Sequence, residues 1–210
     1  TYAAAGDQLG YWQFFPASSN ENETWGIIPV WGFADVVASS AEGVDAGERI
    51  FGYYPTNSYL KMQNIKVLEN RLVDGAEHRS KLPPGYNTYR RVGKEADHDS
   101  SMDNMRMLLW PLYITSFCLW DSLQHNAWYG AKQVIVISAS SKTSIGLGYA
   151  LAADTDAPTS IGLTSKRNQA WVASLGLYDK TMNYDELGEI DASIPTVIVD
   201  MSGNSQLLAD

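Results

Sequence analysis

The chain has 210 residues and carries 15 basic and 24 acidic side chains, which gives a formal net charge of −9. This charge works against binding to nucleic acid or to an anionic membrane surface. The single cysteine, Cys118, excludes an internal disulfide and a cysteine-based zinc site, and it favours a reducing compartment. A hydrophobic content of 45% indicates a folded globule. We therefore expect a soluble intracellular protein of the cytoplasm or of an organelle interior.

Residues 1–105 have the pattern of short strands joined by loops. A glycine-containing turn precedes the β-prone pair Ile50-Phe51, and the stretch 57–68 is interpreted as two further short strands. The stretch 74–101 is polar and contains a Pro-Pro-Gly sequence. We expect it to be a long surface loop rather than part of the core.

The longest apolar stretch covers residues 107–120. It is shorter than the roughly 20 residues that a membrane-spanning helix requires. We interpret it as a core helix with Pro111 near its first turn, where the missing N–H of proline costs little. No membrane span is therefore expected.

From residue 106 onward, strands and helices alternate. The β-branched run 134–137 is followed by a small-residue turn and a helix, residues 158–176 repeat this order, and residues 194–200 are a further apolar strand. Apolar strands that alternate with helices of 10–15 residues are typical of a parallel sheet built from βαβ units. The sequence therefore predicts a mixed α/β protein with a β-rich domain over 1–105 and a doubly wound parallel sheet over 106–210.

The turn after the run 134–137 is rich in small hydroxyl residues. Doubly wound sheets bind ligands at the carboxyl ends of their strands, and a pyrophosphate requires small residues and free N–H groups at a helix start. The candidate phosphate-binding residues are Ser138, Ser140, Ser141, Lys142, Thr143, Ser144 and Gly146. Serines stand where a G-x-G-x-x-G fingerprint has glycines, and Val136 stands where a P-loop has its first glycine. An ordinary small-residue turn is therefore the alternative.

The second predicted strand of this half leads into Ser165, Lys166 and Arg167. A site that prefers NAD usually has an acidic residue here to bind the ribose 2′-hydroxyl. A hydroxyl and two cations suit a 2′-phosphate instead, the arginine through its planar fork and the lysine as a point charge. The alternative is that both basic side chains are simply solvated. Their placement against the helix dipole favours the ligand interpretation.

Six motifs follow one another along the chain, namely GVDAGERIFG, LYITSFCLWDSL, VIVISASSKTSIG, IGLTSKRNQAWVASLG, DKTMNYDE and VIVDMSG. In this order they resemble the medium-chain dehydrogenase/reductase superfamily, and most of all its zinc-independent quinone-oxidoreductase and enoyl-reductase branch. The motifs PVWGFADVV, LPPGYNTYRRV and SASSKTSIG resemble a poorly characterised group within that branch. The resemblance spans nearly the whole chain.

This resemblance implies a GroES-like catalytic domain over residues 1–105, followed by a Rossmann cofactor domain over residues 106–210. Zinc-dependent relatives have a Gly-His-Glu sequence after a proline, where this chain has Val30-Trp31-Gly32 after Pro29. Neither a catalytic nor a structural zinc is therefore expected. The resemblance implies instead a metal-free, NADPH-dependent oxidoreductase that reduces quinones, enones or carbonyl compounds, with the nicotinamide supplying the chemistry.

The resemblance also assigns roles to single residues. Lys166 and Tyr184 match positions that hold the adenosine 2′-phosphate in quinone-reductase-like members. Thr115 matches a threonine beside the nicotinamide. Tyr11 lies near a tyrosine that enoyl reductases use as a proton donor, although Trp12 aligns equally well and a packing role for Tyr11 is the alternative.

Two departures from the family pattern favour a second hypothesis. Serines and a lysine replace the glycine fingerprint, and the chain ends after the fourth expected Rossmann strand, as in a fragment or a truncated homologue. The second hypothesis is a catalytically inactive reductase-like subunit with a structural or docking role in a larger assembly, for which an aromatic-rich first half is suited. An active chain would take a small-molecule substrate, and a homodimer or a larger assembly fits either hypothesis.

Overall fold

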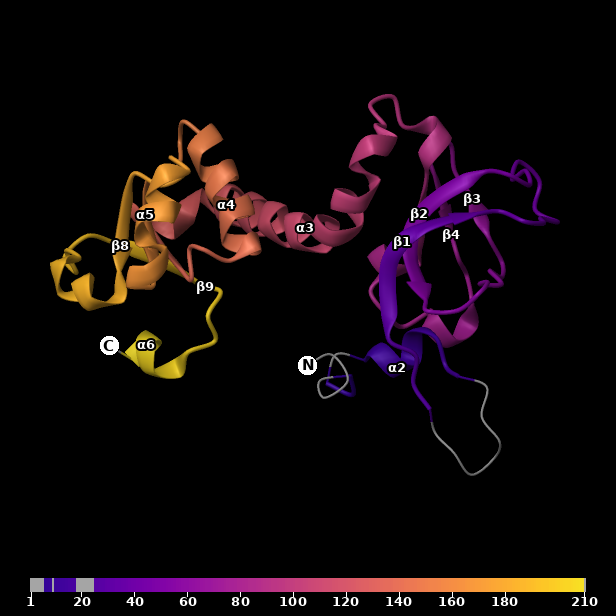
Figure 1. The fold of residues 1–210 in the computed structure, drawn as a ribbon, viewed down its shortest axis with the longest axis horizontal. Helices are drawn as coiled ribbons and strands as arrows, with labels where there is room; N and C mark the ends of the chain where they lie inside the picture. Colours follow the sequence, from indigo (N-terminus) through magenta and orange to yellow (C-terminus); the bar gives the residue numbers. More distant parts are fainter. Residues whose placement is uncertain (1–5, 9, 18–24, 210) are drawn as a thin grey trace. The chain divides into compact units, whose positions relative to one another are not determined.

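The computed structural model describes residues 6–8, 10–17 and 25–209 of the chain (Figure 1). Contacts between residues divide the chain into two compact units, residues 1–108 and residues 109–210. Helix α3 (Asp103–His125) contains the boundary. The first unit is built on an antiparallel sheet and the second on a parallel sheet, which confirms the mixed α/β class predicted from the sequence.

The antiparallel sheet of the first unit has the strand order β1-β2-β5-β4-β3. Its strands are β1 (Pro29–Asp35), β2 (Arg49–Pro55), β3 (Lys66–Val67), β4 (Arg71–Val73) and β5 (Thr88–Arg91). Besides the start of α3, the described helical segments of this unit are α2 (Tyr11–Phe14) and the 3-10 turns η1 (Glu77–Arg79), η2 (Pro84–Asn87), η3 (Val92–Lys94) and η4 (Ser100–Met102). Strands β1 and β2 pair along their full length, and this hairpin supports much of the aromatic core.

Aromatic side chains make up much of the core of the first unit. Phe14 of α2 packs edge-on against Tyr53 of β2, with the ring centroids 5.3 Å apart, and Trp31 of β1 lies 5.3 Å from the same ring. The Tyr89 hydroxyl donates a hydrogen bond of 2.9 Å to the Tyr53 carbonyl. Because buried polar groups require such partners, the Tyr89 phenol is both packed in the core and hydrogen-bonded.

The polar stretch 74–101 is not a surface loop, which corrects the expectation from the sequence. It contains β5, whose Tyr89 is completely buried, and an ion pair between Asp74 and Arg79 that is equally inaccessible. Polar composition was misleading here because these side chains bond to one another inside the core, as buried charges must. Of the stretch 57–68, which was expected to form two strands, only β3 is a strand.

The parallel sheet of the second unit has the strand order β8-β7-β6-β9. Its strands are β6 (Gln133–Ile137), β7 (Thr159–Thr164), β8 (Lys180–Asn183) and β9 (Thr196–Asp200). Helix α4 (Lys142–Ala153) connects β6 to β7, α5 (Lys166–Ser174) connects β7 to β8, and η6 (Tyr184–Glu189) and α6 (Ser205–Ala209) follow β8 and β9 (Figure 1). Val134 and Val136 pack with Leu147 of α4, whereas Ile135 and Ile137 belong to a separate core cluster. Both faces of β6 are thus buried, as in other parallel sheets.

Helix α3 differs from the core helix predicted over residues 107–120. It begins at Asp103, directly after η4, so Pro111 lies inside the helix and not in its first turn. The helix starts early because Asp99 accepts a hydrogen bond from the Ser101 N–H and so stabilises the preceding turn. Several of its apolar side chains are exposed, among them Leu108, Tyr113 and Phe117.

A left-handed turn, η5 (Ala127–Gly130), joins α3 to β6. Ala127, Trp128 and Tyr129 have φ angles of 47°, 54° and 52°, and Gly130 follows with 77°. Such angles cost each non-glycine residue about 1–2 kcal/mol. The Trp128 side chain is only 6% exposed and belongs to the core cluster of Val134 and Val136, so burial of this large ring offsets the strain.

Candidate functional site

The parallel sheet has a topological switch point between β6 and β9. From β6 the chain proceeds through β7 to β8 on one side, and β9 then pairs with β6 on the other side. In open α/β sheets, ligands bind in the crevice outside the carboxyl ends of the strands at such a point. The turns that begin at Ser138, after β6, and at Met201, after β9, therefore border the candidate site.

Ser138 adopts a left-handed backbone conformation with a φ of 63°. Glycine takes this conformation without strain, so Ser138 provides the tight turn that a glycine usually provides. The phenol of Tyr184, at the start of η6, is hydrogen-bonded to Ser138. Burial raises the pKa of Tyr184, and its hydrogen bonds to Ser138 lower this pKa by less. The structure thus brings these two predicted site residues together at the carboxyl end of β6.

Helix α4 begins with a side-chain cap. The Ser141 Oγ accepts a hydrogen bond of 3.1 Å from the Ser144 N–H, and the Ser141 hydroxyl donates to the Ser144 Oγ at 2.8 Å. A cap of this kind satisfies one of the N–H groups at a helix start that lack intrahelical partners. Since Lys142 is exposed in the first turn, the start of α4 combines backbone donors, the helix dipole and a positive charge, all of which favour an anion.

Gly146 allows α4 to pack closely against α3. A Cβ at this position would lie 2.6 Å from the Ser116 Oγ. The Ser116 hydroxyl donates to the carbonyl oxygens of Thr143 in α4, at 2.7 Å, and of Leu112 in α3, at 2.9 Å. The packing of the two helices is therefore sufficient to explain a glycine at this position, whether or not a ligand binds nearby.

The turn after β7 carries the basic residues. Ser165 is the N-cap residue of α5 but makes no side-chain cap bond, and Lys166 and Arg167 follow it in exposed positions. Ile137 and Leu163 are partners in the parallel pairing of β6 with β7. The starts of α4 and α5 consequently lie at the same edge of the sheet, as the sequence predicted for its two tips.

Ser140 connects these two turns. Thr164, the last residue of β7, donates from Oγ1 to the Ser140 Oγ at 3.2 Å, and Asn168 of α5 donates from Nδ2 to the same oxygen at 3.0 Å. The Ala139 N–H bonds to the Leu163 carbonyl at 3.0 Å. Thr164 and Asn168 flank the predicted basic tip in the sequence, but they received no role because their inward orientation has no signature in the residue pattern.

The turn after β9 forms the other border of the switch point. The Asp200 carboxylate accepts hydrogen bonds from the Ser202 N–H (2.7 Å), the Ser202 hydroxyl (2.6 Å) and the Gly203 N–H (3.2 Å). The bonds from Ser202 hold the pKa of Asp200 below its usual range. Sequence reasoning identified a polar end on this strand but no site residue, because the neighbour of β9 in the sheet was unknown.

The two residues expected to act in catalysis lie in different units. Thr115 is exposed on α3, and its Oγ1 donates to the Pro111 carbonyl at 2.9 Å within the same helix. Tyr11 belongs to α2 in the first unit, where its ring centroid is 6.4 Å from that of Phe14. Their catalytic roles stay predictions.

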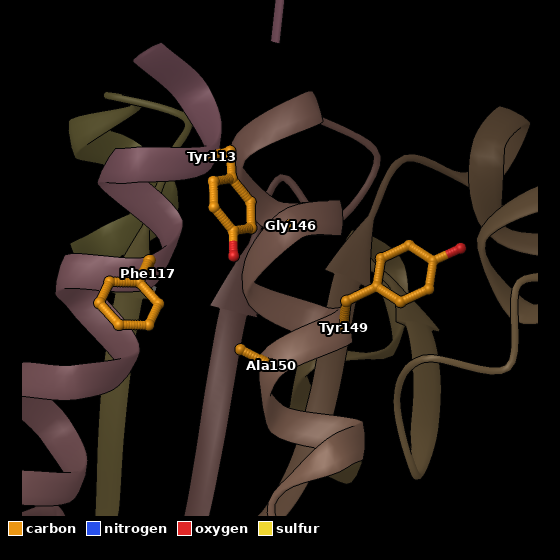
Figure 2. A pocket seen from close by; sticks show the side chains of 5 residues that line it. All are labelled: Tyr113, Phe117, Gly146, Tyr149 and Ala150. Carbon is orange, nitrogen blue, oxygen red and sulfur yellow. The ribbon is translucent and has the colours of Figure 1, made fainter. Parts of the chain in front are cut away.

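A pocket of ≈ 210 Å³ lies between α3 and α4 in the second unit (Figure 2). Its lining consists of Tyr113, Phe117, Gly146, Tyr149 and Ala150. Figure 2 shows the Tyr113 and Phe117 side chains projecting from α3, while Tyr149 and Ala150 are carried by α4. The lining is mainly apolar and includes none of the serines of the turn after β6, so this hollow is chemically different from the sheet edge.

Trp31 and Gly32, which the sequence resemblance aligned with zinc-ligand positions, both lie in β1. The Trp31 indole stacks on the Phe51 ring at 5.9 Å. Across residues 6–8, 10–17 and 25–209, no group of three or more His, Cys, Asp or Glu side chains could hold a metal ion. No helix in this part of the chain is long and apolar enough to cross a membrane.

The fold defines a two-unit α/β protein whose open parallel sheet has its switch point at a serine-rich turn. The chain belongs to the family described as "Protein of unknown function (DUF2855)", whose model matches residues 1–210. No curated protein shows a significant sequence match.

Two solved structures match most of the chain. A human synaptic vesicle membrane protein VAT-1 homolog-like protein matches with a TM-score of 0.43 and 14% identity, over 83% of this chain and 47% of that one. The CurF ER cyclopropanase from the curacin A biosynthetic pathway matches with a TM-score of 0.40 and 16% identity, over 86% of this chain and 48% of that one. The chain therefore spans about half the length of each of these proteins.

Proposed function

We propose that the chain binds NADP(H) at the carboxyl edge of its parallel sheet and serves as a metal-free reductase of quinones, enones or carbonyl compounds. The observation that carries the proposal is the pairing of two helix starts on neighbouring strands, α4 after the serine turn and α5 with Lys166 and Arg167. Backbone N–H groups at the start of α4 suit a pyrophosphate, and the two cations suit a 2′-phosphate. On a chain with a net charge of −9, such a local positive site is needed to hold an anionic dinucleotide.

The serine turn fits a pyrophosphate despite its lack of glycines. Ser138 already has the left-handed conformation that the tight turn requires. The Ser140 Oγ is bonded to Thr164 and Asn168, and Ser141 caps α4. Because these hydroxyls are held by the protein and a cap satisfies a single N–H group, the turn is ordered and the helix start keeps its preference for an anion.

A bound nicotinamide would supply the hydride chemistry, and the chain would supply binding and orientation. We assign Lys166 and Arg167 to the 2′-phosphate and the start of α4 to the pyrophosphate. Since Tyr184 is bonded to Ser138, we assign it to shaping the phosphate turn in addition to the 2′-phosphate role that the resemblance implied. Thr115 beside the nicotinamide and Tyr11 as proton donor complete the proposed set.

The test is a titration of the chain with NADPH and with NADH, in which tryptophan fluorescence reports binding. Each charge-assisted bond to the 2′-phosphate contributes about 1–3 kcal/mol, so Lys166→Ala/Arg167→Ala should abolish the preference for NADPH. The matched control is Lys132→Ala/Lys180→Ala, which removes the same charge from exposed positions at the amino ends of β6 and β8. A Lys166→Ala/Arg167→Ala variant that keeps the preference would refute the proposed site.

The second hypothesis, an inactive subunit with a docking role, draws support from α3. Tyr113, Ile114 and Phe117 are 57%, 36% and 47% exposed on this helix, and the apolar pocket lies beside them. Exposed aromatic clusters are typical of protein interfaces. This hypothesis predicts stable association with itself or with another protein whatever the cofactor state. A monodisperse monomer in native mass spectrometry, together with NADPH binding, would decide against it.

A further inference from the structure

The first turn of α5 lacks the features that stabilise the first turn of α4. Ser141 caps α4 with its side chain, whereas Ser165 at the same position of α5 makes no such bond. A missing cap costs a helix about 1 kcal/mol. Lys166 and Arg167 add two positive charges at the end where the dipole disfavours them. Left to these local factors alone, the start of α5 would fray.

Asn168 holds this turn in place. It lies in the first turn of α5, and its Nδ2 donates a hydrogen bond of 3.0 Å to the Ser140 Oγ on the turn after β6. The backbone N–H of Asn168 also bonds to the Ser165 carbonyl at 2.8 Å. On the side of α4, the start of α5 is therefore anchored by a bond to another strand's turn and not by a local cap, while Gln169 bonds to Glu186 and Asn183 on the side of β8.

The Ser140 hydroxyl is suited to this role. A serine oxygen accepts through two lone pairs and donates one hydrogen, and Thr164 and Asn168 are the two donors to this oxygen. Thr164 is 1% exposed, so the hydrogen bond from the end of β7 to Ser140 is held rigidly by the surrounding core. Neither bond uses the Ser140 hydrogen, which leaves it to donate to an anion at the turn.

A fixed Asn168 side chain sets the directions in which the side chains of the two preceding residues leave the helix. Neighbouring side chains on a helix are about 100° apart and those two positions apart face nearly opposite ways. With Asn168 turned toward Ser140, the orientations of the exposed Lys166 and Arg167 are set relative to the phosphate turn. On the basis of the NADP(H) binding proposed above, we propose that Asn168, acting through Ser140, is a positioning residue that determines selectivity for the 2′-phosphate.

The experiment compares Asn168→Leu with Gln169→Leu in titrations with NADPH and with NADH. Gln169 is the next residue of the same turn, but it bonds to Glu186 and Asn183 and not to Ser140. Asn168→Leu should lower the ratio of Kd for NADH to Kd for NADPH by about tenfold, equivalent to one charge-assisted bond. Gln169→Leu should change this ratio far less, because the bond from Asn168 to Ser140 remains. Hydrogen exchange of the backbone over 165–170 should become faster in Asn168→Leu.

The outcomes separate the two proposals. A wild-type chain that binds neither dinucleotide would overturn the proposed function, and the selectivity role would fall with it. A wild-type chain that prefers NADPH, with an Asn168→Leu variant that keeps the full preference, would leave the proposed function standing and overturn the role of Asn168. An equal loss of affinity for both dinucleotides would also overturn it, because a merely structural effect weakens both.

Discussion

The two units of this protein bury different kinds of polar side chain. In the first unit charged side chains enter the core, where Asp74 pairs with Arg79, and the Tyr89 hydroxyl bonds to the backbone. In the second unit residues 134–137 of β6 fill the core with aliphatic side chains, and polar groups such as Ser140 gather where the strands end. The comparison teaches that a polar residue marks a candidate site when it follows a buried strand, whereas a polar stretch without that context can equally be core.

The largest effect should come from the buried ion pair of the first unit. Asp74→Asn keeps an oxygen for the backbone N–H groups of Gln63 and Ala76, but it leaves the Arg79 charge without a counter-charge. Breaking a buried pair in this way costs about 3–5 kcal/mol. Urea unfolding combined with hydrogen exchange of β4 and β5 would measure the loss.

The matched control is a pair at the surface of the same unit. Asp35 and Arg49 are 3.3 Å apart, with side chains 59% and 47% exposed. Asp35→Asn should cost less than about 1 kcal/mol because water already screens the pair. Equal losses in Asp74→Asn and Asp35→Asn would contradict the view that the first unit depends on charges inside its core.

In the second unit the largest loss of stability should come from a substitution that disturbs tight packing, and not from one that removes a charge. Gly146→Ala places a Cβ against the Ser116 Oγ and should cost about 1–3 kcal/mol through overpacking. The double variant Gly146→Ala/Ser116→Ala lacks the clashing oxygen, and it should recover a large part of the lost stability, as measured by thermal unfolding. Gly188→Ala, which meets open space, is the control. A failure of the double variant to recover would show that the clash is not the cause.

A smaller effect should distinguish strain from hydrogen bonding at Ser138. Ser138→Ala removes the side-chain hydrogen bond to Tyr184 and keeps the left-handed strain, whereas Ser138→Gly removes both that bond and the strain. Ser138→Gly should therefore be more stable than Ser138→Ala by about 1 kcal/mol. Urea unfolding of the second unit measures the difference, and the reverse order of stability would exclude strain at this turn.

The smallest effect should be the acid sensitivity of the first unit. Burial raises the pKa of the Glu95 carboxyl, but its hydrogen bonds to Arg106 and the charges of Arg106 and Arg90 lower it by more, to below its ordinary value of 4.5. The stabilisation is therefore present above pH 4.5 and is lost as the pH falls through the folded-state pKa.

Glu95→Gln should remove about 0.5–1 kcal/mol at neutral pH and less in acid. Thermal unfolding at pH 7 and at acid pH measures this change, and Glu69→Gln, which removes one exposed charge elsewhere, is the control for net charge. A loss for Glu95→Gln that does not shrink in acid would show that packing, and not charge, is responsible.

Much of the second unit could be predicted from the sequence because its signals are local. The aliphatic run 134–137 and the hydroxyl-rich turn after it lie next to each other in the chain. The strand, the helix start and their place at the sheet edge could therefore be predicted from this one stretch. The first unit resisted prediction because its β5 depends on partners far away in the sequence. Arg91, for example, bonds to Glu48 at 2.5 Å across 43 positions.

The candidate site could be predicted only in outline, for the same reason. The serines and the basic tip were identified from their positions after strands. The links from Ser140 to Thr164 and Asn168, and the Asp200 turn beside β6, depend on which strands are neighbours. Strand order is a property of the sheet as a whole, and no single stretch of residues contains it.

The left-handed turn at Ala127–Gly130 changes how α3 and β6 are coupled. A right-handed helix grows by adding one hydrogen bond per residue, and the last such bond described for α3 runs from the Asn126 N–H to the Ser122 carbonyl. Helical hydrogen bonding therefore ends at the turn, and the end of α3 is coupled to β6 through side chains instead, since Leu123 lies in the same core cluster as Val134 and Val136. The buried Trp128 fixes the turn on the side of the sheet. Because Leu123 and Trp128 share this cluster with β6, a loss of order at the end of α3 would loosen the packing of the strand that borders the candidate site.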